Sequence, residues 1–188
     1  QEPGVAALKD GRLMMLCRSY DGFVVRSYSN DGGVAWGAGQ AVPELVISSD
    51  SSAINVKRIP GTGDLLLLRT TGGEAPNRTP LVSAISTDDG LTWSNERIIA
   101  SDAQEIYGYP SVEFIGDRAL IGYNSRMGAH LAQMEVDWFY GGAQVPEPSA
   151  AALSLLAVLS LSAYYGRRWR RALPGKAASR SITAKHAF

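Results

Sequence analysis

The stretch Ser86-Thr87-Asp88-Asp89-Gly90-Leu91-Thr92-Trp93 decides the fold, because it repeats the pattern of Ser29-Asn30-Asp31-Gly32-Gly33-Val34-Ala35-Trp36. Both copies read Ser-x-Asp-x-Gly-x-x-Trp, and we call them the first and second Asp box in chain order. In such a turn the Asp side chain accepts backbone amides, the Gly takes positive φ and the Trp packs over the turn. Each box therefore predicts a structural β-hairpin turn, not a catalytic site.

A second pattern repeats outside the boxes, in which Gly and Asp precede an apolar run. It occurs at Gly11, Gly63 and Gly116, which are spaced 52 and 53 residues apart. Three further stretches are rich in β-branched or aromatic residues and predict strands: 22–28, 81–85 and 111–115. A period near 50 with short strands in each unit is typical of propeller blades. We expect an all-β fold with about three blades before Tyr140 and no long amphipathic helix there.

The composition limits the classes of function. The chain has 18 basic and 18 acidic side chains and a formal net charge of zero, so it offers no global charge for binding nucleic acid. Cys17 is the single cysteine, which excludes an intrachain disulfide and a cysteine-based zinc site. Its apolar neighbours predict a buried thiol. We expect neither a metal nor a cofactor.

Residues 1–140 resemble the bacterial sialidase-like family with BNR, or Asp-box, repeats. Four stretches carry the resemblance besides the boxes: Glu2-Pro3 with Asp10-Gly11-Arg12-Leu13 and Arg18; Arg78-Thr79-Pro80-Leu81; Tyr109-Pro110-Ser111-Val112; and the strand ending in Tyr123. The resemblance implies a six-bladed β-propeller of sialidase type, of which this chain carries about three blades. It implies that Arg18 and Arg78 bind substrate, that Tyr109 is the catalytic nucleophile and that Glu2 assists it.

These residue types suit an acidic sugar. Sialic acid carries a carboxylate on its anomeric carbon, and a planar guanidinium binds a carboxylate through paired charge-assisted hydrogen bonds. That anion would repel a carboxylate nucleophile, whereas a tyrosine is neutral until a glutamate takes its proton. The resemblance implies an exported exo-α-sialidase-type hydrolase that cleaves terminal sialic acid or a related acidic sugar. It also implies that another arginine and an acid/base Asp come from blades preceding Gln1, so that residues 1–140 alone would not cleave.

Several alternatives stay open at this point. Tyr107 and Tyr109 both flank Gly108, and we prefer Tyr109 as the nucleophile because it directly precedes Pro110. The arginines of the proposed site are alternatively ordinary salt-linked side chains, and a match at Glu2, so near the start, arises easily by chance. Four other side chains are expected to be solvated or locally paired: Arg26, Arg58, Arg69 and His130. The whole protein is alternatively a non-catalytic carbohydrate-binding propeller or a hydrolase of another acidic glycan.

The sequence changes character after Tyr140. Residues 141–149 predict a linker containing Pro146-Glu147-Pro148, and residues 150–166 predict a transmembrane helix, although 16 uncharged residues span only about 24 Å as a helix. Residues 167–188 predict a basic cytoplasmic tail. This order resembles the PEP-CTERM sorting tag of Gram-negative bacteria. It implies an exosortase-type partner, export to the cell surface or medium, and transient anchoring in the inner membrane; a plain membrane anchor or a buried helix with a basic cap is the alternative.

Overall fold

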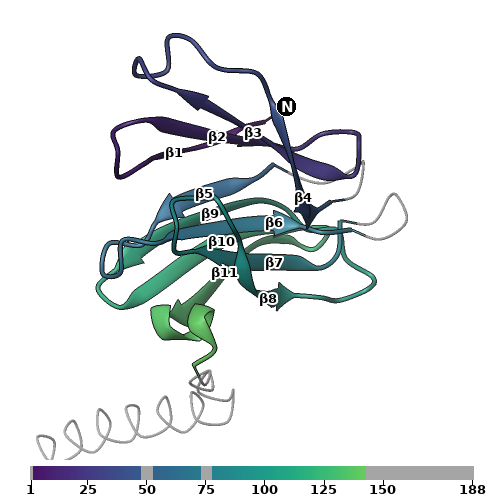
Figure 1. The fold of residues 1–188 in the computed structure, drawn as a ribbon. Helices are drawn as coiled ribbons and strands as arrows, with labels where there is room; N and C mark the ends of the chain where they lie inside the picture. Colours follow the sequence, from purple (N-terminus) through teal and green to yellow (C-terminus); the bar gives the residue numbers. More distant parts are fainter. Residues whose placement is uncertain (1, 48–52, 73–77, 143–188) are drawn as a thin grey trace, which may run out of the picture. The chain divides into compact units, whose positions relative to one another are not determined.

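The computed structural model describes residues 2–47, 53–72 and 78–142, which form three antiparallel sheets (Figure 1). The first sheet contains β1 (Gly4–Ala7), β2 (Leu13–Cys17), β3 (Phe23–Ser29) and β4 (Gln40–Val46). The second contains β5 (Asn55–Arg58), β6 (Leu65–Thr70), β7 (Leu81–Ser86) and β8 (Ser94–Ala100). The third contains β9 (Gly108–Ile115), β10 (Arg118–Ser125) and β11 (Gly128–Glu135), after which comes a 3₁₀ helix, η1 (Val136–Tyr140). The predicted all-β fold with about three blades is confirmed.

Each sheet is a meander in which strands that follow one another in the chain are hydrogen-bonded neighbours. The predicted strands at 22–28, 81–85 and 111–115 correspond to β3, β7 and part of β9. The three Gly-Asp patterns lie at the turns that lead into β2, β6 and β10. The repeat of about 50 residues is therefore one sheet, and each Gly-Asp turn joins the first two strands of its sheet.

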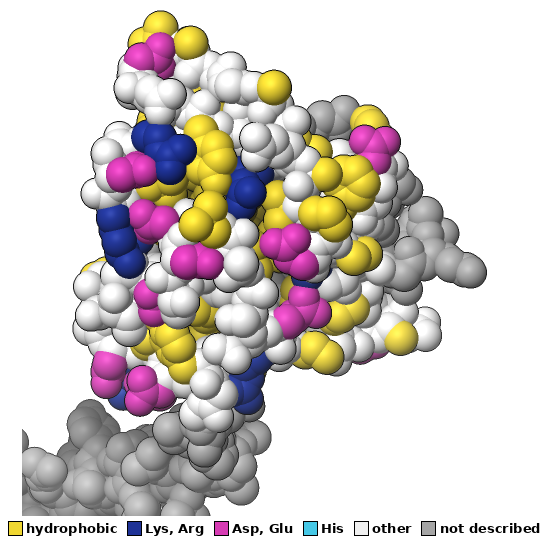
Figure 2. Space-filling model, viewed as in Figure 1, with side chains coloured by type: hydrophobic (Ala, Val, Ile, Leu, Met, Phe, Trp, Pro, Cys, Tyr) yellow, Lys and Arg dark blue, Asp and Glu magenta, His cyan; other side chains and the backbone are white. Residues whose placement is uncertain are grey.

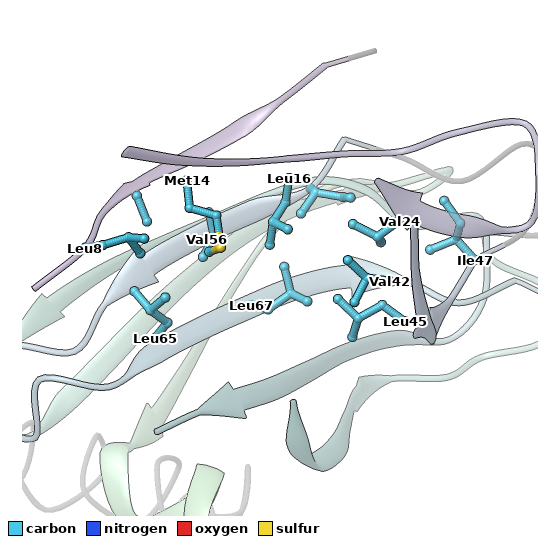
Figure 3. Close-up of a cluster of buried hydrophobic side chains, with 12 residues drawn as sticks. Leu8, Met14, Leu16, Val24, Val42, Leu45, Ile47, Val56, Leu65 and Leu67 are labelled. Carbon is cyan, nitrogen blue, oxygen red and sulfur yellow. The ribbon is translucent and has the colours of Figure 1, made fainter. Parts of the chain in front are cut away.

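The second sheet is the middle layer, because apolar side chains cover both of its faces. Leu65 and Leu67 of β6 pack into one cluster with the first sheet, whose members include Met14 and Leu16 (Figure 3). Leu66 and Leu68 point the other way and pack with the third sheet and η1. Burial on both faces explains why this stretch is continuously apolar and does not alternate with polar residues.

Cys17 departs from the prediction of a buried thiol. It is only partly buried, whereas Met14 and Leu16 of the same strand are fully buried. Successive side chains of a strand point to opposite faces, so Cys17 lies on the face of β2 that is turned away from the second sheet. An apolar run alone did not distinguish the two faces.

The two Asp boxes form the turns between β3 and β4 and between β7 and β8, as predicted, with matching hydrogen bonds. In the second box the Ser86 hydroxyl donates to Asp88 (2.8 Å) and accepts from the Gly90 amide (2.7 Å), and the Thr92 amide donates to Asp88 (2.9 Å). Partial burial tends to raise the pKa of Asp88, but the hydrogen bonds from Thr92 and Ser86 outweigh it and the pKa is lowered.

The first box repeats these contacts. Ser29 donates to Asp31 (2.7 Å) and accepts from the Gly33 amide (2.9 Å), and the Ala35 amide donates to Asp31 (2.9 Å). The Ala35 amide and the Ser29 hydroxyl lower the pKa of Asp31. The boxes are thus equivalent turn-stabilising devices, and nothing in their contacts points to catalysis.

The second box also binds the first sheet to the second. Asp89 accepts the Lys9 amide (2.6 Å) and the Arg58 guanidinium (2.8 Å), while Arg58 also donates to the Ala7 carbonyl. Arg26 reaches across from β3 and donates to the Gly90 carbonyl. The prediction that these arginines are solvated or locally paired is therefore wrong for Arg26 and Arg58, which join residues that are distant in the sequence.

Arg69 also corrects that prediction. It is 2% exposed, pairs with Glu96 and donates to the Val46 carbonyl of the first sheet (2.6 Å). Burial lowers its pKa, and Glu96 opposes this effect. By contrast, His130 is exposed and contacts the nearby Ser125 hydroxyl (2.8 Å), as expected for a locally paired side chain.

The predicted transmembrane helix and basic tail lie outside the described residues, as does the predicted linker from residue 143 onward. In the described ranges, which end at residue 142, no helix has the length and apolar character needed to cross a membrane.

Candidate functional site

The four predicted site residues lie at the same end of the sheets. Glu2 precedes β1, Arg18 follows β2, Arg78 lies before β7, and Tyr109 is the second residue of β9. Because neighbouring strands are antiparallel, the start of a first or third strand and the end of a second strand fall at one end of a sheet. We call this end the candidate-site end. The Asp boxes lie at the opposite end, where β3 and β7 finish.

Strand β5 aligns the sheets with one another. A Cβ on Gly4 of β1 would lie 2.9 Å from the Ile54 carbonyl oxygen, so the two strands begin side by side. Lys57 of β5 donates to the Val112 carbonyl of β9 (3.2 Å), so β9 borders β5 as well. The starts of β1, β5 and β9 therefore lie next to one another. β5 lies between β1, which follows Glu2, and β9, which contains Tyr109.

Glu2 and Arg18 form a direct ion pair at this end. Arg18 Nη2 lies 2.8 Å from Glu2 Oε2, and the side chain of Arg18 is 19% exposed and that of Glu2 is 39% exposed. A guanidinium has five N–H donors, so an arginine that binds one carboxylate retains donors for a second one. The pair thus holds the arginine at the rim of the sheet, with its planar group fixed by a neighbouring acid.

Arg78 lies beside the segment that leads into β9. The Tyr107 amide donates to the Arg78 carbonyl (3.3 Å), and the Thr79 hydroxyl donates to the Glu105 carbonyl (2.6 Å). Glu105 in turn accepts the Arg126 amide (2.9 Å), which ties the turn after β10 to the same segment. The Arg78 carbonyl is therefore bonded to Tyr107, which precedes Tyr109 by two residues.

Tyr109 and Tyr107 have opposite environments. Tyr109 is 57% exposed and has a φ of 51°, in the left-handed region that non-glycine residues rarely adopt. Tyr107 is 5% exposed, and its hydroxyl accepts the Asp102 amide (3.0 Å). Its ring packs edge-on against Tyr123 at 5.8 Å. Of the two rings, that of Tyr109 is therefore the accessible one, and its role as the nucleophile stays a prediction.

Backbone strain gathers at the candidate-site end. Four non-glycine residues with positive φ occur among the residues that the structure describes: Glu2, Asp89, Asn95 and Tyr109. Asp and Asn tolerate this conformation because their short side chains bond locally, and both of these lie in or after the second box. Glu2 and Tyr109 lack such a short, locally bonding side chain, and strained residues of this kind cluster at functional sites.

The sequence patterns did not single out one polar residue at this end, Asn55. Asn55 is the first residue of β5, and its Oδ1 is buried without a hydrogen-bond partner among the described residues. The alternation of Ile54, Val56 and polar neighbours was the available signal for a strand here, but the stretch is too short to stand out from a loop.

Away from the candidate-site end, the described residues show a mixed charge distribution and a hollow. Figure 2 shows acidic and basic side chains interspersed over the visible face, with apolar side chains between them. A hollow of about 390 Å³ lies beside the first Asp box, lined by residues that include Tyr28 and Trp36, and none of the four predicted site residues borders it. Within the described ranges no cluster of acidic, His or Cys side chains is arranged to hold a metal ion.

Residues 1–120 match the family model described as a BNR repeat-like domain. The chain belongs to this family. No curated protein matches the sequence. The match covers the first two sheets, β9 and the beginning of β10, including both Asp boxes, and it confirms the family resemblance that the boxes predicted.

Solved structures of other proteins share the fold at low sequence identity. A leech intramolecular trans-sialidase, solved with 2,7-anhydro-Neu5Ac, has a TM-score of 0.61 and 15% identity over 76% of this chain and 24% of its own. The NanB sialidase K499G mutant from Streptococcus pneumoniae has a TM-score of 0.59 and 15% identity over 72% and 23%. An ulvan lyase of polysaccharide lyase family PL25 has a TM-score of 0.55 and 12% identity over 80% and 43%.

These similarities show the fold alone. This chain spans about a quarter of the length of the two sialidases. Its three sheets are accordingly propeller blades of the sialidase-like type, and enzymes with different chemistry share that architecture.

Proposed function

We propose that the full-length protein is an exo-α-sialidase-type glycoside hydrolase that acts on terminal sialic acid or a related acidic sugar. The observation that carries the proposal is the gathering of Arg18, Arg78 and an exposed, strained Tyr109 at one end of the sheets. The two arginines bind the sugar carboxylate. Tyr109 attacks the anomeric carbon.

Each group has a defined part in the proposed reaction. The Tyr109 oxygen forms a bond to the anomeric carbon as the glycosidic bond breaks, and the phenol proton passes to Glu2. The leaving oxygen takes a proton from an acid supplied by another part of the full-length protein. Water then hydrolyses the tyrosyl intermediate, and two displacements at the same carbon retain its configuration. The ion pair with Arg18 positions the Glu2 carboxylate for this step.

Hydrolysis by the full-length protein tests this proposal. We expect release of 4-methylumbelliferone from its α-sialoside. Release from glycosides of neutral sugars is expected to be at least about 10-fold slower, because these sugars lack the carboxylate that the arginines bind. Fluorescence of the released product measures both rates. Faster release from a neutral glycoside would contradict the assignment of the arginines.

A second function is a non-catalytic, carbohydrate-binding propeller. The observation that favours it is the Glu2–Arg18 ion pair, because Arg18 already engages the carboxylate that hydrolysis would use to take the tyrosine proton. Binding of sialyllactose by the full-length protein without any release of sialic acid would support this function over the hydrolase. A hydrolase of another acidic glycan would instead cleave a different member of a substrate panel.

We also propose that the protein is exported and carries a C-terminal sorting tag that an exosortase-type enzyme cleaves near Pro146-Glu147-Pro148. The support is the order of the Pro-Glu-Pro motif, the uncharged stretch and the basic cluster. We expect the mature protein to end close to this motif, which intact-mass measurement of the protein from its native host would show. A mature protein that retains Arg167 and the residues after it would contradict the cleavage.

A further inference from the structure

Asn55 is a polar residue with an unsatisfied group at the candidate-site end. Its Oδ1 is buried, and no donor in the described part of the chain bonds it. Most buried polar atoms in folded proteins have a hydrogen-bond partner, and one without a partner destabilises the fold. A buried acceptor without a partner therefore needs a physical explanation, and a donor group of a bound ligand would supply one.

The side chain of Asn55 faces the strand that carries Tyr109. Val56 packs into the core shared with the first sheet. Because side chains alternate along a strand, Asn55 and Lys57 share the opposite face of β5. Lys57 contacts the Val112 carbonyl and pairs with Glu113 on β9. Asn55, two residues closer to the candidate-site end than Lys57, therefore faces the first residues of β9.

The backbone around Asn55 also contacts the strand that follows Glu2. A Cβ on Gly4 would lie 2.9 Å from the Ile54 carbonyl oxygen and 3.3 Å from the Val56 amide nitrogen, the two groups that flank Asn55. Only a glycine allows this approach without a shift of backbone atoms. Asn55 therefore lies between β1, which Glu2 precedes, and β9, which carries Tyr109.

On the basis of the function proposed above, we infer that Asn55 is a further ligand-binding residue of that site. Its amide oxygen accepts a hydrogen bond from a hydroxyl or acylamino N–H of the acidic sugar. Arginine side chains are donors only, so Arg18 and Arg78 recognise the carboxylate but not a donor group of the sugar. A buried acceptor adds that second recognition, and it disfavours sugars that lack the matching donor.

Steady-state kinetics and thermal unfolding of the full-length protein test the inference. For Asn55→Ala we expect KM for the 4-methylumbelliferyl α-sialoside to rise about 10-fold, with kcat within about threefold, because one hydrogen bond to the ligand is lost. The Tm is expected to stay the same or rise, since the substitution removes an unsatisfied acceptor. Asn30→Ala deletes the same side chain from an exposed position of the first Asp box, and we expect it to change neither KM nor kcat.

Asn55→Asp provides a second variant of nearly the same size. Its negative charge repels the sugar carboxylate, so we expect a larger increase in KM that shrinks as salt is added. An unchanged KM in both variants, beside an active parent protein, would overturn the role of Asn55 alone. A lower Tm with an unchanged KM would show that Asn55 is structural. A parent protein that neither hydrolyses the sialoside nor binds sialyllactose in calorimetry would overturn the proposed function itself, and the inference with it.

Discussion

Replacing Tyr109 by phenylalanine is expected to lower kcat of the full-length protein toward a 4-methylumbelliferyl α-sialoside by at least about 10³-fold. The substitution removes the oxygen that forms the bond to the anomeric carbon and leaves the ring in place. Loss of the hydroxyl is not expected to disturb packing, because the side chain is 57% exposed. KM is expected to stay within about threefold, since the arginines that bind the carboxylate are unchanged. Stopped or continuous fluorescence assays measure both constants.

Tyr107→Phe is the matched control, because it deletes a hydroxyl only two residues away. That hydroxyl accepts the Asp102 amide (3.0 Å), so its loss is expected to lower stability by about 1 kcal/mol and to leave kcat within about threefold. If Tyr107→Phe abolished turnover while Tyr109→Phe remained active, the nucleophile would be assigned to the wrong tyrosine. If neither variant lost activity, hydrolysis would not pass through a tyrosine of this segment.

The difference between the two tyrosines also shows what the sequence did not contain. The order Tyr109-Pro110-Ser111 favoured Tyr109 over Tyr107 by resemblance alone. The physical distinction is the burial of Tyr107 against the exposure and positive φ of Tyr109. Tyr109 lies where the register between β9 and β10 shifts, opposite the step from Gly122 to Asn124. A bulge inserts residues into one strand and redirects their side chains, and the local composition did not predict it.

The fold itself was largely predictable, because its signals are local. Each Asp box specifies a hairpin turn through contacts within eight residues, and the Gly-Asp turns recur with the period of one sheet. The strands that escaped prediction are β1, β4, β5, β8 and β11, of which β8 and β11 are mostly exposed and so have no apolar pattern. Contacts between sheets, such as the buried Arg69 that reaches the Val46 carbonyl, depend on distant residues and left no mark in the local sequence.

Gly90→Ala is expected to lower the free energy of unfolding by about 2–4 kcal/mol, more than the Gly11→Ala or Tyr107→Phe substitutions. Gly90 has a φ of 84°, where an alanine is strained by about 1 kcal/mol. A Cβ there would lie 2.5 Å from the Met14 Sδ and 2.7 Å from its Cε, closer than non-bonded atoms approach. Met14 is fully buried between the first and second sheets, so its side chain must repack against the surrounding core, and overpacking adds about 1–3 kcal/mol. Urea unfolding of the full-length protein measures the loss.

Gly11→Ala separates the two causes of that loss. Gly11 has nearly the same backbone conformation, with a φ of 89°, but a Cβ there would meet nothing within 4 Å. We expect it to cost only the conformational part, about 1 kcal/mol, so the difference between the variants reports the overlap with Met14. Equal losses would mean that Met14 moves aside freely and that the contact of the second Asp box with the first sheet is loose. A much larger loss for Gly90→Ala would instead show that the box acts as a rigid joint between two blades, in addition to its role within its own hairpin.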